Sequence, residues 1–392
     1  MSEVIELFRE QDTRDELGIG VIRDAFADML FPGTNTMQTR ARYFLFVPWI
    51  YRRIEDQGFR SVDMPKRTRK DETALIKALM AAGEADAVIG RVSQERLQRM
   101  PSNIYWLGLG AWGIRQFDGS QMQYQRSIDG WRRRRAQRPR GDDGGAILGD
   151  QIANWDPALP PVPEGFPEGA RFALSLDEAE YLRDKVAVAP GTRDTLLRHL
   201  VVNGELWDGE IDFIWNHPQA ETFPEEAKKR VAHARAFSET IYGGPLLYNL
   251  MLAELARSDE LTDHYRAELI AWRSLLEARA EALRAWDQGA FWGLLERSRA
   301  RVHPWARAFV REWTRFALEA ADGRDVSSFP AARRLIEARE KRLKGGLSRL
   351  TNRRALENWN GAAGAYRLTY RWNVAQPIIR DILAGLEGGG DA

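Results

Sequence analysis

The residues best suited to chemistry in this sequence are arginines that occur in two dense runs. Six arginines fall within residues 131–140, directly before the Gly/Asp-rich stretch 141–149. A guanidinium group matches a phosphate with paired hydrogen bonds, and close like charges repel one another. Such a run therefore faces either water or a polyanion.

The second run lies between residues 341 and 371 and is interleaved with Trp359, Tyr366, Tyr370 and Trp372. Cations mixed with aromatic rings suit phosphate contact combined with base stacking. They equally suit a helical core whose arginine stems extend outward to solvent. The predicted nucleic-acid contacts from the two runs are Arg132, Arg133, Arg134, Arg135, Arg138, Arg140, Arg349, Arg353, Arg354, Arg367 and Arg371.

The charge of the chain is unevenly distributed, although its net charge is only +1. Residues 39–140 hold 21 Lys/Arg against 10 Asp/Glu, and residues 331–380 hold 12 against 3. This asymmetry favours a polyanionic partner, DNA or RNA. The alternative is that these cations pair with acidic residues elsewhere in the fold.

The densest acidic cluster is Glu205, Asp208, Glu210 and Asp212. Carboxylates can hold a metal ion for phosphodiester hydrolysis, but a metal-dependent nuclease also needs a lysine two residues after the last acid, and Ile214 occupies that position. The five histidines lie far apart. We therefore predict surface acids or acids paired with arginines, and no metal site, with the nuclease kept as an alternative and any catalytic residues unknown.

The segment Gly108–Gly113 has the GxGxxG spacing of dinucleotide-binding loops. That motif requires a preceding strand and a following amphipathic helix, and the chain turns quickly after Gly113. Close helix packing by small residues is the favoured interpretation, and no cofactor is predicted. No GxxxxGK[ST] loop is present either.

The chain contains no cysteine, which excludes disulfides and thiol catalysis and fits a reducing cytoplasm. Its N-terminus is acidic and has no apolar signal region. The longest apolar stretch, 241–256, is interrupted by Asn249 and Glu254 and predicts a buried helix. We expect a cytoplasmic protein that does not interact with membranes.

The hydrophobic spacing predicts a mainly α, multi-helix fold with at most a few short strands. Ser175 and Glu178 form a capping box, and tryptophans recur at helical spacing over 269–286 and 305–316, which indicates core packing. A shorter helix is predicted over 71–82. The segments 117–127 and 201–215 are candidates for short hairpins.

Five prolines between 154 and 169 suggest a linker or a loop lying against the fold. The predicted division is an N-terminal helical domain with a basic arm (1–153), a Pro-rich linker (154–169) and a C-terminal helical domain (170–392).

Several blocks of sequence resemble an uncharacterised family of bacterial proteins, described only as a domain of unknown function. They are Gly18–Thr34, Gln38–Tyr51, Ser102–Trp106, Gly113–Arg115, Leu350–Trp359 and Tyr370–Trp372. The resemblance spans nearly the whole chain and implies a setting among helicase and phospholipase D-like genes in anti-phage defence clusters. It implies no catalytic residue.

The leading hypothesis is therefore an accessory subunit of a bacterial defence system, more a binding protein than an enzyme, which contacts nucleic acid, partner proteins or both through arginine-rich surfaces. The first alternative is a protein scaffold for a helicase or nuclease partner. The second is the metal-dependent nuclease.

Overall fold

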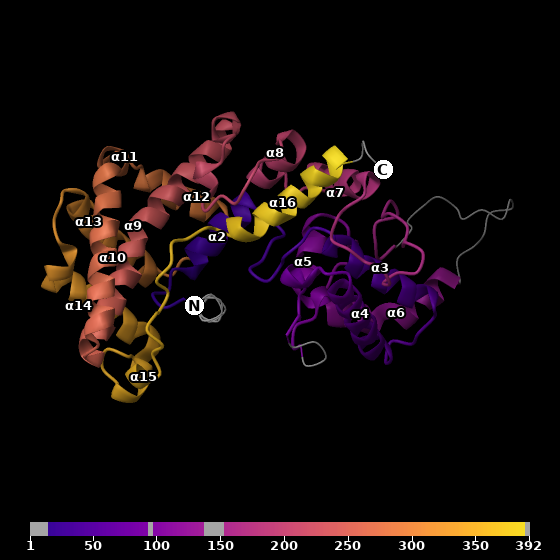
Figure 1. Cartoon of the computed structure of the whole chain (residues 1–392), viewed down its shortest axis with the longest axis horizontal. Coiled ribbons are helices and arrows are strands. Elements are labelled where there is room, and N and C mark those ends of the chain that lie inside the picture. Colours follow the sequence, from indigo (N-terminus) through magenta and orange to yellow (C-terminus); the bar gives the residue numbers. More distant parts are fainter. Residues whose placement is uncertain (1–14, 93–96, 137–152, 389–392) are drawn as a thin grey trace. The chain divides into compact units, whose positions relative to one another are not determined.

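The computed structural model describes residues 15–92, 97–136 and 153–388 (Figure 1). Of these described residues 64% are helical, and none of them lies in a strand or sheet. One isolated bridge joins Arg115 and Trp155. The prediction of a mainly α, multi-helix fold is confirmed.

The two predicted hairpins were wrong. Residues 117–127 contain the start of helix α6 (Gln121–Ala136), and residues 201–215 contain the end of α8 (Leu196–Asn203) and the start of a short 3-10 helix, Ile214–Asn216. Trp207 and Ile214 are buried by packing, without a strand partner. This segment is therefore an irregular chain that packs on the helical core, where Trp207 stacks with Trp372.

The contacts divide the chain into two compact units. Unit 1 takes its described residues from 1–29 and 228–370, and unit 2 from 30–227 and 371–392. The chain thus passes between units at three places. This division differs from the expected one, which was placed at 154–169 on composition alone.

Unit 1 is a helical bundle around buried tryptophans. Trp272 and Trp313 stack with ring centroids 6.2 Å apart, and α10 packs along α13. Both indole N–H groups donate to backbone carbonyls of α9, at Glu239 and Thr240. Its α-helices are α2 Gly20–Leu30, α9 Glu225–Ala256, α10 Asp259–Ala278, α11 Ala280–Arg284, α12 Gln288–Arg297, α13 Pro304–Ala321, α14 Pro330–Lys344 and α15 Arg353–Glu357.

Unit 2 has an aromatic core centred on α3, which packs against α4 and α5, while α16 packs against α7 and α8. The predicted capping box is present at α7, where Ser175 Oγ accepts from the Glu178 N–H at 3.3 Å. Its α-helices are α3 Tyr43–Asp56, α4 Met64–Ala81, α5 Pro101–Ala111, α6 Gln121–Ala136, α7 Leu176–Val188, α8 Leu196–Asn203 and α16 Trp372–Glu387.

Short 3-10 turns connect several of these helices. They are η1 Ala85–Ala87, η3 Ile214–Asn216, η4 Ala220–Thr222, η5 Val326–Ser328 and η6 Gly345–Leu347.

The Pro-rich segment lies against α3 as part of unit 2. The indole N–H of Trp49 donates to the Pro160 carbonyl at 2.9 Å, and the Arg53 guanidinium donates to the carbonyl of Phe166 and lies over its ring. The prolines were interpreted as marking either a linker or a loop lying against the fold, and the structure shows the loop.

None of the helices in the described part of the chain is long and apolar enough to span a bilayer.

Candidate nucleic-acid interface

The first predicted arginine, Arg132, supports the fold. It lies on α6 and is half-buried, and its guanidinium donates to the carbonyls of Ile54 at 3.2 Å, Glu55 at 3.0 Å and Phe59. The last carbonyls of a helix lack intrahelical donors, and a cation there also complements the helix dipole. Arg132 therefore caps α3.

The rest of the first run divides into exposed residues and residues outside the description. Arg133 and Arg134 are exposed on α6. Arg135 belongs to the same helix, but its side chain lies outside the described residues, as do Arg138 and Arg140 entirely. Two of the six arginines are therefore seen to face solvent.

In the second run, Arg349 is engaged inside unit 1. Its guanidinium lies 3.1 Å from the carboxylate of Glu16, which also pairs with Lys344. Glu16 is 8% exposed. These two cations neutralise an acid that the fold buries. Desolvation would lower the pKa of Arg349, but its interactions with the Tyr248 hydroxyl and the Glu16 carboxylate raise it.

A second buried acid, Glu340, anchors the same segment. It accepts hydrogen bonds from the Tyr248 hydroxyl and the Arg349 N–H, both at 2.7 Å, and from the Ser348 hydroxyl. Burial would raise the pKa of Glu340, but these hydrogen bonds, together with the charge of Lys344, hold it below its usual value. The chain after α14 is thereby fixed to the core.

Arg367 lies beside a third buried acid, Glu239 of α9, which is fully buried. Arg235 donates to this carboxylate at 2.8 Å and Arg279 at 3.3 Å, while Arg367 lies 3.8 Å from it. Three partly exposed guanidinium groups thus surround one carboxylate within unit 1.

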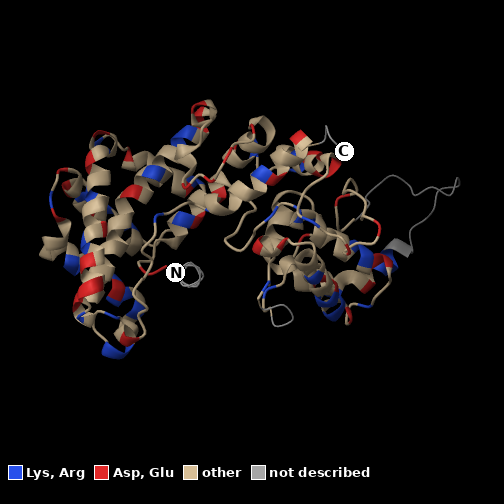
Figure 2. Cartoon of the chain, viewed as in Figure 1, with Lys and Arg blue, Asp and Glu red and all other residues tan. Residues whose placement is uncertain are grey.

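Arg371 falls in unit 2, apart from the other members of its run. It adopts a left-handed backbone conformation, with φ of 64°, immediately before α16 and donates to the Thr34 carbonyl at 2.9 Å. Arg353 and Arg354, by contrast, are exposed on the short helix α15, and Arg353 lies 3.4 Å from Glu357. Figure 2 colours the basic residues of this part of the ribbon blue. The second run therefore presents two of its five predicted arginines to solvent.

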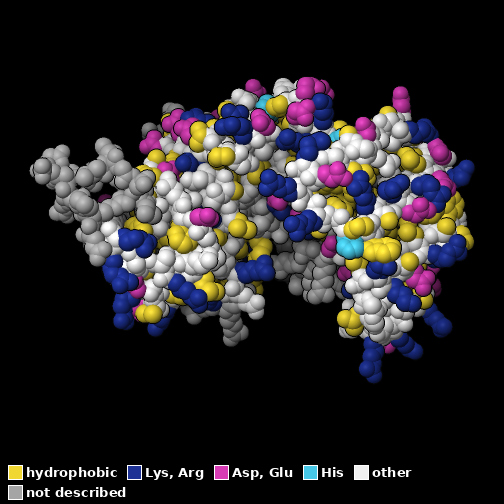
Figure 3. Space-filling view, turned by 180° about the vertical axis from the view of Figure 1, so that it is seen from behind, with side chains coloured by type: hydrophobic (Ala, Val, Ile, Leu, Met, Phe, Trp, Pro, Cys, Tyr) yellow, Lys and Arg dark blue, Asp and Glu magenta, His cyan; other side chains and the backbone are white. Residues whose placement is uncertain are grey.

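The structure reveals a cationic surface that the predicted residues did not include. The α4 cationic face consists of Lys66, Arg69, Lys70 and Lys77, which lie on one side of the helix at intervals of three, four and seven residues. All four are exposed, and Figure 3 shows clustered Lys and Arg side chains over this unit.

The acids of α4 point the other way. Asp71 and Glu72 are buried, so every exposed charged side chain of this helix is a cation. Asp71 pairs with Arg67 at 3.2 Å, and Glu72 accepts from the Ser102 N–H at 2.6 Å. Burial raises the pKa of Glu72 to about 7, so that at neutral pH part of the population carries no charge there.

Hydrogen bonds join the start of α4 to α6. Ser61, just before α4, donates its N–H to Asp129 of α6 at 3.1 Å and also donates its hydroxyl to that carboxylate. This contact and the capping by Arg132 fix the α6 segment that bears Arg133 against the loop that leads into the α4 cationic face.

A second surface absent from the prediction is formed by Trp305 and Arg342 in unit 1. Trp305 was expected in the core with the rest of its stripe, but it is 52% exposed, whereas Phe309, Trp313 and Phe316 are buried. The Arg342 guanidinium carbon lies 3.6 Å from the centroid of the Trp305 ring. The aromatic residues of α13 are therefore buried in the core from Phe309 onward, whereas Trp305 at the start of the helix lies at the surface.

The acidic cluster does not converge. Glu205, Asp208, Glu210 and Asp212 are all exposed. Over the described residues, no three His, Asp or Glu side chains lie close enough to hold a metal ion. The geometry gives the nuclease alternative no assembled site.

The GxGxxG segment lies mostly within α5 and serves packing. A Cβ atom at Gly108 would overlap the carbonyl oxygen of Gly33 and come within 2.9 Å of the Phe44 ring. No strand precedes this helix in the described chain, so the small-residue interpretation is confirmed.

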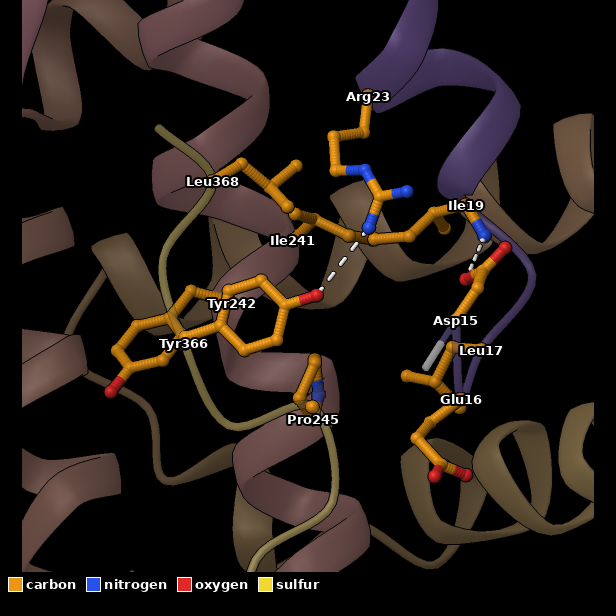
Figure 4. Close-up of a pocket in the computed structure, with 11 residues that line it drawn as sticks. Asp15, Glu16, Leu17, Ile19, Arg23, Ile241, Tyr242, Pro245, Tyr366 and Leu368 are labelled. Atoms are coloured by element: carbon orange, nitrogen blue, oxygen red, sulfur yellow. Dashed lines mark hydrogen bonds between the residues drawn. The ribbon is translucent and has the colours of Figure 1, made fainter. Parts of the chain in front are cut away.

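A small cavity in unit 1 is shown in Figure 4. Tyr242 and Tyr366 line it opposite Arg23, which donates to the Tyr366 hydroxyl at 3.4 Å. Its volume of about 30 Å³ is that of one water molecule. This cavity is too small for a cofactor.

Comparison with known proteins places the chain in a family. The model of a family of unknown function, DUF6361, matches residues 1–385, and the chain belongs to that family. No curated protein matches it, and neither does any solved structure.

Proposed function

We propose that this DUF6361 protein binds nucleic acid through the α4 cationic face, assisted by Arg133 and Arg134 of α6. The observation that carries the proposal is the segregation of charge on α4, whose exposed charges are all cations while its two acids are buried. An ordinary solvated helix mixes both signs on its outer face. A face of one sign supports contact with a polyanion.

The dimensions of the face fit a nucleic-acid backbone. From Lys66 to Lys77 the helix rises about 16 Å, which corresponds to roughly five phosphates along one strand. Contacts to phosphates position a protein on the nucleic acid but carry no sequence information. The proposed binding is therefore independent of sequence and sensitive to salt.

The setting that we propose is an anti-phage defence complex in the cytoplasm, in which this protein is an accessory subunit that holds DNA or RNA for a helicase or nuclease partner. The family resemblance suggests this setting. An accessory role also accords with the exposed, scattered acids at 205–212.

A protein scaffold is the second candidate, favoured by exposed apolar side chains in unit 2. Val62, Leu107 and Met122 are each more than half exposed. If the scaffold is the whole function, a helicase or nuclease partner co-purifies with the protein after nuclease treatment, and the protein alone does not bind nucleic acid.

The test is a fluorescence-anisotropy titration of a labelled 20-base-pair duplex, and of its RNA counterpart, between 50 and 300 mM salt. The double variant Lys66→Gln/Lys70→Gln should lower the slope of log affinity against log salt by about 2, because each phosphate contact contributes about 0.9.

The matched control is Arg297→Gln/Arg311→Gln, which removes the same charge from exposed positions on α12 and α13. It should leave the slope unchanged. A flat salt response of the unmodified protein, or equal slopes for the two double variants, would refute the proposal.

A further inference from the structure

The exposed tryptophan of unit 1 occupies an unusual position. His303 caps α13, Pro304 is its first residue, and Trp305 follows in the first turn. A tryptophan normally buries most of its large apolar surface, and leaving half of it in water forgoes part of that stabilisation. Core packing, which accounts for the rest of this stripe, does not account for Trp305.

The neighbouring helix end supplies cations and further apolar surface. Arg342, over the indole ring, belongs to the last turn of α14 with Lys341, and both are exposed. Leu343 and Leu347 are 43% and 73% exposed. We call Trp305 and Arg342 the Trp305 platform.

Hydrogen bonds fix the chain that follows Arg342 to the core of unit 1. Glu340 receives the hydrogen bonds of residues 348–350, and Asn352 donates to the Gly346 carbonyl at 2.7 Å. The chain then continues into α15 with the exposed Arg353 and Arg354. The platform therefore needs no large rearrangement before it binds a ligand.

We propose that the Trp305 platform binds single-stranded nucleic acid by stacking a base on the Trp305–Arg342 pair. An exposed indole and a guanidinium plane both offer a π surface, and such stacking contributes about 1–3 kcal/mol per base whatever the sequence. Lys341, next to Arg342 in the last turn of α14, provides further positive charge for the phosphates. The bases of an intact duplex are stacked on one another, so the site selects unpaired strands.

This inference does not rest on the α4 cationic face, which belongs to the other unit and contacts only backbone. A protein partner that docked on the platform would require the apolar area of Trp305 but not its aromatic ring. That difference separates the two kinds of occupant.

The experiment compares two 15-nucleotide probes, oligothymidine and a strand of the same length with abasic tetrahydrofuran sites throughout. Trp305→Leu keeps an apolar side chain and removes the indole. It should weaken oligothymidine binding roughly fivefold to a hundredfold while changing abasic binding less than twofold. Trp305→Phe should retain most of the affinity.

Ile270→Ala is the matched control, because Ile270 is 55% exposed on α10 of the same unit. It should bind both probes as the unmodified protein does. Since Trp305 is half exposed, circular dichroism should show unchanged helicity in each variant.

Equal binding of oligothymidine by the unmodified protein and Trp305→Leu overturns the proposal, as does an equal loss for the two probes. A partner protein released by Trp305→Ala but retained by Trp305→Leu would assign the platform to protein docking instead. Lys66→Gln/Lys70→Gln, measured with the same probes, should leave the dependence on Trp305 intact, so this proposal and the one for α4 fail separately.

Discussion

The basic segment 341–371 and helix α4 use similar residues for opposite purposes. In unit 1, Lys344, Arg349 and Arg367 lie beside the buried carboxylates of Glu16 and Glu239. In unit 2, the acids of α4 are buried and its Lys66 and Lys70 face solvent. Of these two regions, the one that the sequence predicted to bind nucleic acid is thus the one with more of its charge used inside the fold.

The difference has an energetic basis. A buried carboxylate must be neutralised, either by cations and hydrogen-bond donors or by a proton. Glu340 is an example of the first, with a pKa held below its usual value, and Glu72 of the second, with a pKa of about 7. Local charge density alone therefore does not identify a phosphate-binding surface.

The largest expected effect comes from removing the acid that anchors the paired cations. Glu340→Ala should lower the free energy of unfolding by about 3–5 kcal/mol, because Lys344 and four hydrogen-bond donors lose their buried partner. Urea denaturation followed by circular dichroism measures this loss.

Glu337→Ala is the control, since Glu337 is an exposed acid on the same helix. It should change stability by less than about 0.5 kcal/mol. If the two substitutions lower the free energy of unfolding equally, the buried acid of segment 341–371 does not anchor its cations, and the contrast with α4 is contradicted.

The next effect tests neutralisation by a proton in unit 2. A carboxyl group whose pKa is raised on folding contributes stability at low pH that is lost as the pH rises through the folded value, here about 7. Glu72→Gln cannot ionise, and its carbonyl can still accept from Ser102. At pH 8 it should be more stable than the unmodified protein by on the order of 3 kcal/mol.

Urea denaturation at pH 5 and pH 8 measures the effect. At pH 5 the difference should fall to about 1 kcal/mol, because the folded carboxyl keeps its proton and pH 5 lies only just above the unfolded-state pKa of 4.5. The same stability difference at both pH values would show that Glu72 has an ordinary pKa.

A smaller effect separates neighbouring arginines on α6. Arg132→Met keeps the apolar stem but leaves three carbonyls without their charged donor, and it should cost about 1.5–3 kcal/mol. Arg133→Met, at an exposed position, should cost less than about 0.5 kcal/mol. Thermal unfolding of the two variants in parallel decides whether the run contains one structural arginine, and equal costs would contradict the capping role.

Much of the fold follows from local sequence, whereas the use of each cation does not. The Ser175 capping box and the buried positions Trp272 and Trp313 were predictable because spacing determines a helix face. The partner of Arg349 is Glu16, more than 300 residues away in the sequence. No local pattern predicts that contact.

The α4 cationic face, by contrast, was within reach of the sequence. The predicted helix began at Asp71, but α4 begins at Met64 with Pro65 in its first turn, where proline is favoured. Starting the helix there aligns Lys66, Lys70 and Lys77 opposite the buried Leu75 and Leu79. The seven residues that the predicted helix left out, 64–70, include three of the four cations of this face.

The smallest expected effect tests whether the exposed cations of unit 2 contact a polyanion. Arg133→Gln should leave stability unchanged and lower the salt slope of duplex binding by about 0.9, whereas Arg133→Lys should keep the slope because counterion release depends on charge. Anisotropy titrations from 50 to 300 mM salt measure both. If Arg133→Gln keeps the full slope while Lys66→Gln/Lys70→Gln lowers it, α6 lies outside the interface, and the α4 cationic face contacts the phosphates without it.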